Sequence, residues 1–232
     1  MSSDPDTPDT AAGDWLFKQS CEFERGVTAI DQLPPADRPE FAFAGRSNVG
    51  KSSLLNALTH QTHLARVSNT PGRTQQLNFF RLPADKLGAF LVDLPGYGYA
   101  KAPKKDARRW TDLMMAYLRG RPTLKRVFLL IDARHGLKST DAPFVSAFDD
   151  SAVSYQIVLT KTDKLKPGEL VRVRESTLAA LKAHVAAHPR LIESSSVLGT
   201  GLAELRGEIA ALIDVPALGY KSAPLRRGGG KE

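Results

Sequence analysis

The sequence predicts an α/β protein in which helices cover both faces of a mixed, mostly parallel six-stranded sheet that contains one antiparallel hairpin strand. Short runs rich in Val, Ile, Phe and Leu alternate along the chain with stretches of helical periodicity. A glycine-rich turn also joins the first of these runs to a leucine-periodic stretch. These observations indicate a three-layer architecture with one sheet at its centre.

Six segments have the composition of buried strands, and they begin at residues 41, 77, 88, 127, 155 and, more weakly, 190. Helical spacing of apolar residues predicts helices over residues 54–58, 103–118, 139–148, 170–185 and 202–212. The runs at 77 and 88 are joined by a PADK linker, which is too short for a helical crossover. These two strands are therefore expected to form an antiparallel hairpin within an otherwise parallel sheet.

The two ends of the chain differ in composition from this core. Residues 1–20 are expected to be an acidic, disordered extension, because the first fourteen residues hold four aspartates and no lysine or arginine. Residues 216–232 are expected to be a flexible basic tail, because the last part is glycine-rich and lacks apolar periodicity. The folded domain is therefore expected to span residues 21–215.

Composition favours a cytoplasmic protein without membrane association. The acidic N-terminal segment is unlike a signal or transit peptide, and no apolar run approaches the length of a membrane span. Cys21 is the single cysteine of the chain, which excludes an internal disulfide and a cysteine-based zinc site.

The formal net charge is +7, which favours polyanionic partners, nucleic acid first. Residues 101–126 carry nine Lys or Arg against two Asp. Taken alone, this segment is equally well explained as a solvated helix face and loop.

The stretch 45-GRSNVGKS-52 fits the pattern G-x-x-x-x-G-K-[ST]. Glycines let successive backbone N–H groups curl around an anion, and the helix that follows adds the partial positive charge of its N-terminus. Lys51 would place an ammonium group on the terminal phosphates, and Ser52 would offer its hydroxyl to Mg²⁺. A plain glycine-rich turn is the competing interpretation, but the expected strand before the loop and helix after it favour a phosphate site.

A second motif, 93-DLPG-96, follows the apolar run at 88. At the end of a strand, Asp93 can reach Mg²⁺ through water, and the N–H of Gly96 can bind a γ-phosphate and report its loss. A D-x-x-G pattern has little value by itself. Its place after the glycine loop, at the end of a strand, makes it informative.

A third motif, 160-TKTD-163, follows the run at 155 and indicates guanine. The Asp163 carboxylate can accept hydrogen bonds from the N1–H and the 2-amino group of guanine. Adenine has no donor at either position, so it would leave this carboxylate unpaired. Lys161 is expected to lie along the base and to brace the glycine loop. Thr160 is shorter than the Asn more familiar there, which puts the purine N7 contact in doubt.

Two further segments complete the expected site. Residues 194–196 (SSS) follow the last predicted strand, where a backbone N–H could reach the guanine O6, although a polar loop is also a reasonable interpretation. Residues 66–76 are polar and broken by Pro71 and Gly72, as expected for a segment that closes on Mg²⁺ and the γ-phosphate. Thr74 is preferred over Thr70 as its Mg²⁺ ligand, because it immediately precedes a strand.

Together, GRSNVGKS, TPGRTQ, DLPGYGYA and TKTD resemble the bacterial EngB-type GTP-binding proteins of the TrmE–Era–EngA–EngB–septin superfamily. The stretch 132-DARHGLKSTD-141 also resembles a segment of that family, with Gly136 where proline is usual. The resemblance covers about residues 20–215.

The resemblance implies a Ras-like P-loop G domain that binds GTP and GDP with Mg²⁺, bound by Ser52 and Thr74. It implies catalytic roles for Lys51, Thr74 and Gly96. It also implies a role in assembly of the large ribosomal subunit and a need for the protein in normal cell division and septation. A monomer is expected. Carried over by position, the nucleotide-lining residues are Gly45, Arg46, Ser47, Asn48, Val49, Gly50, Lys51, Ser52, Gly72, Arg73, Thr74, Gln75, Gln76, Asp93, Leu94, Pro95, Gly96, Thr160, Lys161, Thr162, Asp163, Ser194, Ser195 and Ser196.

Two residues bear on the rate of hydrolysis. Tyr97 stands where a Ras-like enzyme has the glutamine that orients water, so intrinsic GTPase activity is expected to be slow. Asn48 lies where relatives recruit K⁺, so K⁺ and a ribosomal partner are expected to accelerate turnover, although simple hydrogen bonding within the loop is nearly as good an explanation of this residue. Two other classes of protein stay open: a septin-like division scaffold that binds GTP without a ribosomal role, and an ATP-using P-loop kinase.

Overall fold

The computed structural model describes residues 8–65, 76–83, 86–97 and 104–221, with the backbone alone over 104–110. Within these ranges, seven strands form one sheet in the order β1-β3-β4-β2-β5-β6-β7. Strands β2, β4, β5, β6 and β7 pair in parallel, whereas β3 is antiparallel to both of its neighbours. The strands are β1 (Glu22–Val27), β2 (Glu40–Gly45), β3 (Leu77–Leu82), β4 (Ala89–Asp93), β5 (Leu124–Asp132), β6 (Tyr155–Thr160) and β7 (Ile192–Glu193).

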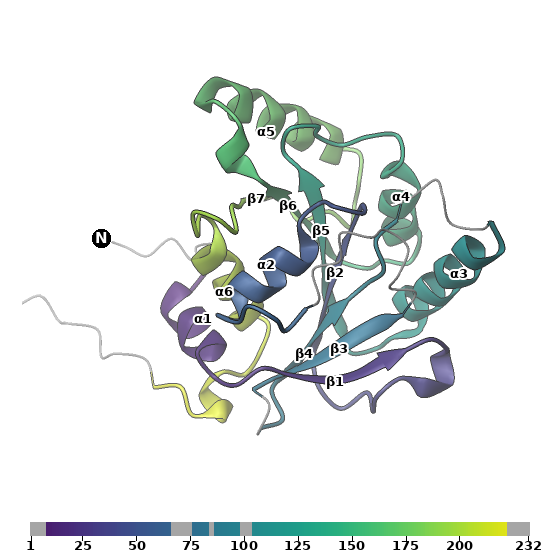
Figure 1. The fold of residues 1–232 in the computed structure, drawn as a ribbon, viewed down its shortest axis with the longest axis vertical. Coiled ribbons are helices and arrows are strands. Elements are labelled where there is room, and N and C mark those ends of the chain that lie inside the picture. The colour runs from purple at the N-terminus through teal and green to yellow at the C-terminus, as the bar shows by residue number, and fades with distance from the viewer. Residues whose placement is uncertain (1–7, 66–75, 84–85, 98–103, 222–232) are drawn as a thin grey trace, which may run out of the picture.

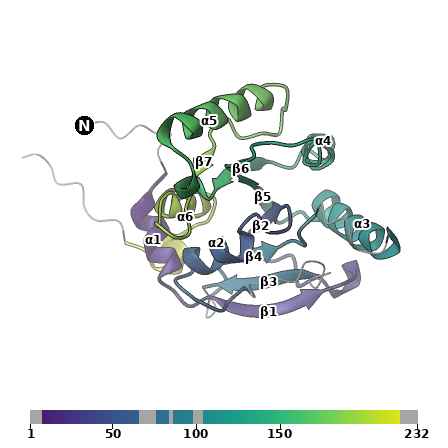
Figure 2. The ribbon, with the colours of Figure 1, turned by 45° about the horizontal axis from the view of Figure 1, so that its top comes forward.

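Helices cover both faces of this sheet (Figures 1 and 2), as predicted. Helices α1, α2 and α6 pack on one face, and α3, α4 and α5 pack on the other. The helices are α1 (Thr10–Phe17), α2 (Lys51–Leu58), α3 (Lys104–Gly120), α4 (Ala142–Asp150), α5 (Pro167–Leu181) and α6 (Leu202–Ala210). In the part of the chain that the structure describes, no helix is both long and apolar enough to cross a lipid bilayer.

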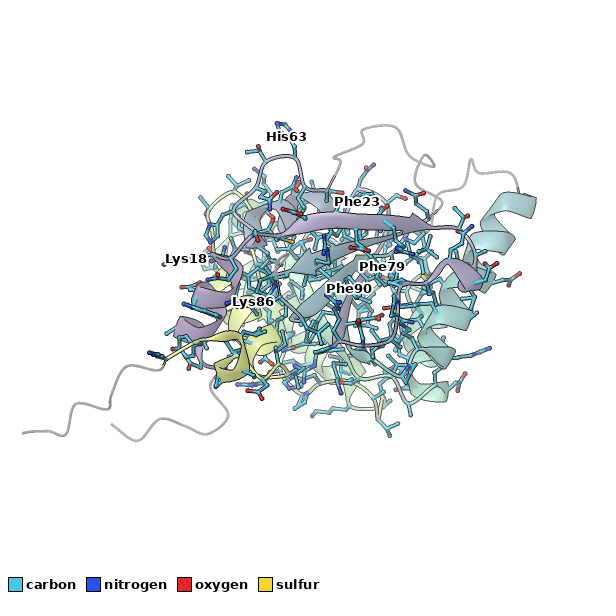
Figure 3. All side chains as sticks on the ribbon, turned by 90° about the horizontal axis from the view of Figure 1, so that it is seen from below. Lys18, Phe23, His63, Phe79, Lys86 and Phe90 are labelled. Atoms are coloured by element: carbon cyan, nitrogen blue, oxygen red, sulfur yellow. The ribbon has the colours of Figure 1, made fainter. Side chains whose placement is uncertain are left out.

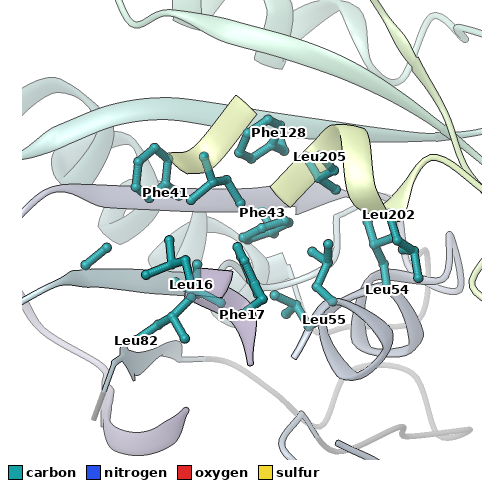
Figure 4. Packing of buried hydrophobic residues seen from close by; sticks show 14 of the residues in the cluster. Leu16, Phe17, Phe41, Phe43, Leu54, Leu55, Leu82, Phe128, Leu202 and Leu205 are labelled. Atoms are coloured by element: carbon teal, nitrogen blue, oxygen red, sulfur yellow. The ribbon is translucent and has the colours of Figure 1, made fainter. Parts of the chain in front are cut away.

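The pleat of β2 separates the two hydrophobic clusters of the protein. Phe41 and Phe43 point to the face covered by α1, α2 and α6, whereas Ala42 and Ala44 point to the other face. The Phe43 ring lies 5.4 Å from that of Phe128, centroid to centroid, in the cluster shown in Figure 4. These four side chains are inaccessible to solvent or nearly so. The strand that carries the glycine loop is thus fixed from both sides.

The hairpin of β3 and β4 is confirmed, but the prediction of six strands is wrong, because β1 adds a seventh at the edge of the sheet. Strand β1 was not predicted because its sequence, EFERGV, has no apolar run. Most of its side chains are exposed or half-buried, so they do not need to be apolar. Phe23 is 54% exposed and packs edge-on against Phe80 at 5.8 Å. Figure 3 shows Phe23 on this outer strand, with Phe79 and Phe90 on the strands beneath it.

The prediction of disorder over residues 1–20 is wrong for residues 10–17, which form helix α1. Asp9 caps the helix, because its carboxylate accepts hydrogen bonds from the N–H groups of Ala11 and Ala12, both at 3.0 Å. Leu16 and Phe17 are buried in the cluster of Figure 4. Asp9, one of the aspartates that suggested disorder, therefore starts a docked helix.

The predicted tail also begins later than residue 216. Leu218 is buried, and the Tyr220 ring packs 5.6 Å from that of Trp15 in α1. Lys86, labelled in Figure 3, donates a hydrogen bond of 2.7 Å to the Leu218 carbonyl. The folded domain thus includes residues up to Tyr220 and brings both ends of the described chain together.

Candidate nucleotide site

Three of the predicted motifs meet at one edge of the sheet. The glycine loop follows β2, Asp93 is the last residue of β4, and Thr160 is the last residue of β6. Because β4, β2, β5 and β6 are parallel neighbours, their carboxyl ends share this edge. Ligands of open α/β sheets bind at this position.

The glycine loop has the backbone conformation that its sequence predicts. Asn48 and Gly50 have φ angles of 64° and 103°, in the left-handed region. A side chain at Gly45 would place its Cβ 2.9 Å from Val49 and 3.0 Å from the Leu130 carbonyl. The loop is therefore folded back tightly over the end of β2.

The start of α2 offers free hydrogen-bond donors to a ligand. Among the described residues, none accepts a hydrogen bond from the backbone N–H of Gly50, Lys51 or Ser52. These groups belong to the first turn of a helix, where N–H groups lack helical partners and carry partial positive charge. By contrast, the Ser47 N–H donates to the Tyr97 carbonyl at 3.0 Å, and the Val49 N–H donates to the Arg46 carbonyl at 3.1 Å. The arrangement suits a group rich in acceptor oxygens, such as a nucleotide phosphate.

Lys51 and Asp93 form an ion pair beside these donors, and their side chains are 11% and 9% exposed. The pair joins the glycine loop to the D-x-x-G motif. Mg²⁺ prefers oxygen ligands. The half-buried Ser52 hydroxyl offers one such ligand directly, and the Asp93 carboxylate can hold a water that binds the ion. These residues fit a Mg²⁺–phosphate group, with the Lys51 ammonium on the phosphates.

Thr160 and Lys161 fasten the base-reading motif to the glycine loop. The Thr160 hydroxyl donates to the Val49 carbonyl at 2.7 Å, and the Lys161 ammonium donates to the Asn48 carbonyl at 2.6 Å. The expected bracing by Lys161 is confirmed. The hydrogen bond from Thr160 to the loop was not predicted from the sequence, which suggested only a contact with the purine N7.

Two neighbouring side chains fix the orientation of the Asp163 carboxylate. The Ser195 hydroxyl donates to one carboxylate oxygen at 2.7 Å, and the Lys164 ammonium lies 3.2 Å from the other. The hydrogen bond from Ser195, followed by that from Lys164, holds the pKa of Asp163 below its ordinary value. The carboxylate is therefore ionised and oriented before any base arrives.

Two of the three serines use their backbone N–H groups within the protein. The Ser194 N–H donates to the Leu159 carbonyl at 2.7 Å, and the Ser195 N–H donates to the Thr200 carbonyl at 3.1 Å. The Ser194 carbonyl in turn accepts a hydrogen bond from the Thr162 N–H at 3.2 Å. Of the three serines, Ser196 is the one whose backbone N–H has no acceptor in the described part of the chain. Its contact with the guanine O6 stays a prediction.

Asp132 is a site residue whose role was not predicted from the sequence. Its carboxylate accepts a hydrogen bond of 2.9 Å from Lys161 and two from the Arg134 guanidinium, at 2.9 and 2.7 Å. Burial opposes its charged form, but the hydrogen bonds from Arg134 and Lys161 outweigh burial, so the pKa of Asp132 lies below its ordinary value. Asp132 therefore holds Lys161 in the orientation that braces the loop.

Tyr97, the residue after D-x-x-G, is engaged within the protein. Its hydroxyl donates to Asp141 at 2.9 Å, and its ring stacks on that of Phe144 with centroids 3.8 Å apart. Burial, followed by the neighbouring Asp141 carboxylate, raises the pKa of Tyr97. In this arrangement the hydroxyl is committed to Asp141, so Tyr97 does not replace a water-orienting glutamine.

Several predicted residues lie outside the described ranges: Thr70, Gly72, Arg73, Thr74 and Gln75. Lys101, the first residue of the basic segment 101–126, also lies outside them. Gln76 is described, and its amide donates to Asn78 at 2.9 Å while its side chain lies over Gly26 of β1. These contacts place the Gln76 side chain on the β1 side of the sheet. For Lys104, Lys105, Arg108 and Arg109, the structure describes backbone in α3.

Comparisons with known proteins agree with this geometry. A family described as "50S ribosome-binding GTPase" matches residues 40–161. A probable GTP-binding protein EngB of Rhodospirillum rubrum is 58% identical over 203 residues, covering 87% of this chain and 88% of the relative. Another, from Cereibacter sphaeroides, is 52% identical over 212 residues, covering 91% of this chain and 96% of the relative.

A solved structure described as a probable GTP-binding protein EngB has the same fold. Its TM-score is 0.58 at 21% identity, covering 75% of this chain and 99% of that one. The domain family, the sequence relatives and the folded motifs all point to one group of proteins. The chain belongs to the EngB-type GTP-binding proteins, within a GTPase family that binds GTP and GDP.

Proposed function

We propose that this protein is a Mg²⁺-dependent GTP switch with slow intrinsic hydrolysis that acts in assembly of the large ribosomal subunit. We further propose that normal cell division and septation depend on this role. In the GTP state, residues 66–76 and 93–102 close on the nucleotide, and the closed form binds ribosomal RNA or protein. Hydrolysis to GDP and phosphate releases it.

The observation that carries the nucleotide part is the connection between the base-reading motif and the phosphate loop. Thr160 and Lys161 bind two successive carbonyls of that loop, and Ser195 orients Asp163 beside them. A ligand that fills both places has phosphates at one end and a base with adjacent donors at the other. Guanine meets this requirement and adenine does not.

Calorimetry with GTP, GDP and ATP, each with and without Mg²⁺, tests this part. We expect binding of GTP and GDP that strengthens with Mg²⁺, and much weaker binding of ATP. Equal affinities for GTP and ATP would contradict the switch and favour an ATP-using enzyme instead.

Slow hydrolysis is supported by Tyr97, whose hydroxyl is bound to Asp141. Stimulation by K⁺ is supported by the position of Asn48, which is exposed in the glycine loop. Single-turnover GTPase rates in matched Na⁺ and K⁺ buffers, with and without large ribosomal subunits, test both statements. Equal rates under all four conditions would remove the K⁺ and ribosome-stimulation proposal.

The ribosomal part is supported by the description of the matching family, which names the 50S subunit. It is also supported by charge: α3 begins soon after the D-x-x-G motif with Lys104, Lys105, Arg108 and Arg109. A basic helix next to a nucleotide-gated segment would couple the switch to a phosphate-rich surface.

Sedimentation with purified large subunits tests this coupling. We expect more co-sedimentation with a GTP analogue than with GDP, and weaker binding with a flatter salt dependence after charge reversal at Lys104 and Lys105. A charge reversal at Lys166 and Lys182, at the two ends of α5, is the matched control. Nucleotide-independent or absent co-sedimentation would instead favour a septin-like division scaffold.

A further inference from the structure

The backbone N–H and the backbone carbonyl of Tyr97 both form hydrogen bonds with the glycine loop. Its N–H donates to the Gly45 carbonyl at 3.2 Å, and its carbonyl accepts from the Ser47 N–H at 3.0 Å. The neighbouring Gly96 lies so close to this loop that an added Cβ would be 3.1–3.2 Å from Ser47 atoms. The D-x-x-G glycine is thus positioned against the loop through the residue that follows it.

The side chain of Tyr97 extends this attachment to α4. Its hydroxyl binds Asp141, which is 1% exposed and immediately precedes the helix. The other Asp141 carboxylate oxygen accepts a hydrogen bond of 2.8 Å from the Lys138 N–H. Stacking on Phe144 restrains the ring from a second direction. Tyr97 is therefore restrained by its backbone, its ring and its hydroxyl.

Asp132 and Asp141, the first and last residues of one loop segment, hold the glycine loop from two sides. Asp132 binds Lys161, which binds the Asn48 carbonyl. Asp141 binds Tyr97, which binds Ser47 and Gly45. One loop, from the end of β5 to the start of α4, thereby restrains both the base-reading and the γ-phosphate-reading motifs.

We propose that Tyr97 is a positioning residue for GTP, which holds the Gly96 N–H where the γ-phosphate arrives, and that Asp141 and Phe144 keep Tyr97 in place. This inference rests on the proposed function, in which Gly96 contacts the γ-phosphate. A group already held in its binding position loses less conformational freedom when the ligand binds. GDP has no γ-phosphate, so this restraint favours GTP over GDP.

The test compares Tyr97→Phe with Tyr117→Phe in the full-length protein. Tyr117 is the matched control, because its buried hydroxyl also donates to a carboxylate, Glu40, at 2.8 Å, but from α3 to the start of β2. Calorimetry gives the dissociation constants of GDP and a non-hydrolysable GTP analogue for each variant. We expect Tyr97→Phe to weaken binding of the GTP analogue about fivefold relative to binding of GDP, which is the effect of losing one hydrogen bond. Tyr117→Phe is expected to leave the ratio unchanged.

Phe144→Leu provides a second variant that removes the ring stacking and keeps the hydroxyl. It is expected to shift the ratio in the same direction, and thermal melting of each variant reports whether it is folded. A wild-type ratio in folded Tyr97→Phe, or an equal shift in Tyr117→Phe, would overturn the inference. Equal binding of ATP and GTP by the wild-type protein would instead contradict the proposed function.

Discussion

The two ends of the sheet both contain buried charges, but they use them differently. At the amino end, the Glu40 carboxylate accepts hydrogen bonds from Tyr117, Arg121 and Thr123, at 2.7–2.9 Å, and is inaccessible to solvent. At the carboxyl end, Lys51 and Asp93 are also paired, but adjacent backbone N–H groups have no acceptor among the described residues.

This difference distinguishes a structural network from a binding site. A carboxylate whose oxygens are all bonded within the protein stabilises the fold and offers nothing to a ligand. Free donors next to a separable ion pair lower stability slightly and are satisfied when an anion binds. Changes at the amino end should therefore affect unfolding, and changes at the carboxyl end should affect nucleotide binding.

The largest expected effect is on binding, from Asp163→Asn. Guanine would lose an acceptor for its 2-amino group, so GTP affinity is expected to fall on the order of 100-fold or more. Xanthine has a carbonyl in place of that amino group, so the asparagine amide can donate to it and xanthosine triphosphate should bind better than to wild type. Calorimetry with both nucleotides measures this change of preference from guanine to xanthine.

Asp31→Asn, in the exposed turn at Ile30–Gln32, is the control for Asp163→Asn. Both variants are expected to melt like the wild type. A melting temperature that fell in Asp163→Asn, with the nucleotide preference intact, would mean that the carboxyl end is not the separate binding region described above.

The next effect is on stability, from Glu40→Gln at the amino end. The neutral side chain leaves the buried Arg121 guanidinium without its counter-charge, which is expected to cost about 3 kcal/mol of unfolding free energy. Urea denaturation measures it, with Glu24→Gln as control, because the Glu24–Arg81 pair is partly exposed and contributes little. A loss of GTP affinity in folded Glu40→Gln would show that the two ends are coupled.

A smaller effect is expected from Gly13→Ala in α1. The added Cβ would lie 2.5 Å from backbone atoms of Arg206 and Gly207, so α1 must move away from α6, at about 2 kcal/mol. Gly168→Ala in α5 is the matched control, because nothing lies within 4 Å of its Cβ. Both are measured by urea denaturation, and similar midpoints for the two variants would contradict the close packing of α1.

The smallest effect concerns pH. Burial, together with the charges of Arg126 and Arg190, holds the pKa of His188 below its ordinary value, against the opposing effects of a hydrogen bond with the Arg190 backbone and of Glu208. The folded state therefore disfavours protonation, so stability is full near pH 7.5 and decreases as the pH falls through about 6.5 and below. Urea midpoints at pH 7.5 and 5.5 should differ more in wild type than in His188→Gln.

Guanine selectivity should survive the same change of pH. The pKa of Asp163 is already below its ordinary value of 3.8, so this carboxylate stays charged at pH 5.5. A loss of GTP preference over ATP at pH 5.5, while the protein stays folded, would show that a group other than Asp163 carries the recognition.

The order of the buried strands along the chain could be predicted from the sequence, because each of them is a continuous apolar run. Strand β1 could not, because an exposed edge strand such as EFERGV lacks that signal. Helix α1 was not predicted because its acidic residues suggested disorder. One of them, Asp14, pairs with the buried Arg206 at 3.0 Å. Helix α5 ends at Leu181, before the predicted end at residue 185, and Val185 is 92% exposed rather than part of an apolar face.

The site could be predicted where a motif determines its own conformation, as in the glycine loop. Its supporting contacts could not be predicted, because they join residues far apart in the chain. The Ser195–Asp163 hydrogen bond spans 32 residues and the Tyr97–Asp141 hydrogen bond spans 44. In both cases the sequence marked the segments as important, and the packing of β6, β7 and α4 decided which atoms meet.

The contact between Trp15 and Tyr220 has a practical consequence for protein engineering. Because α1 and the residues after Pro216–Leu218 are neighbours through this contact, a peptide linker could connect the two terminal regions covalently. The chain could then be opened at the exposed turn near Leu87, which is 60% accessible, to give a circular permutant with new ends. Such a rearranged molecule would keep every motif of the nucleotide site in one uninterrupted polypeptide.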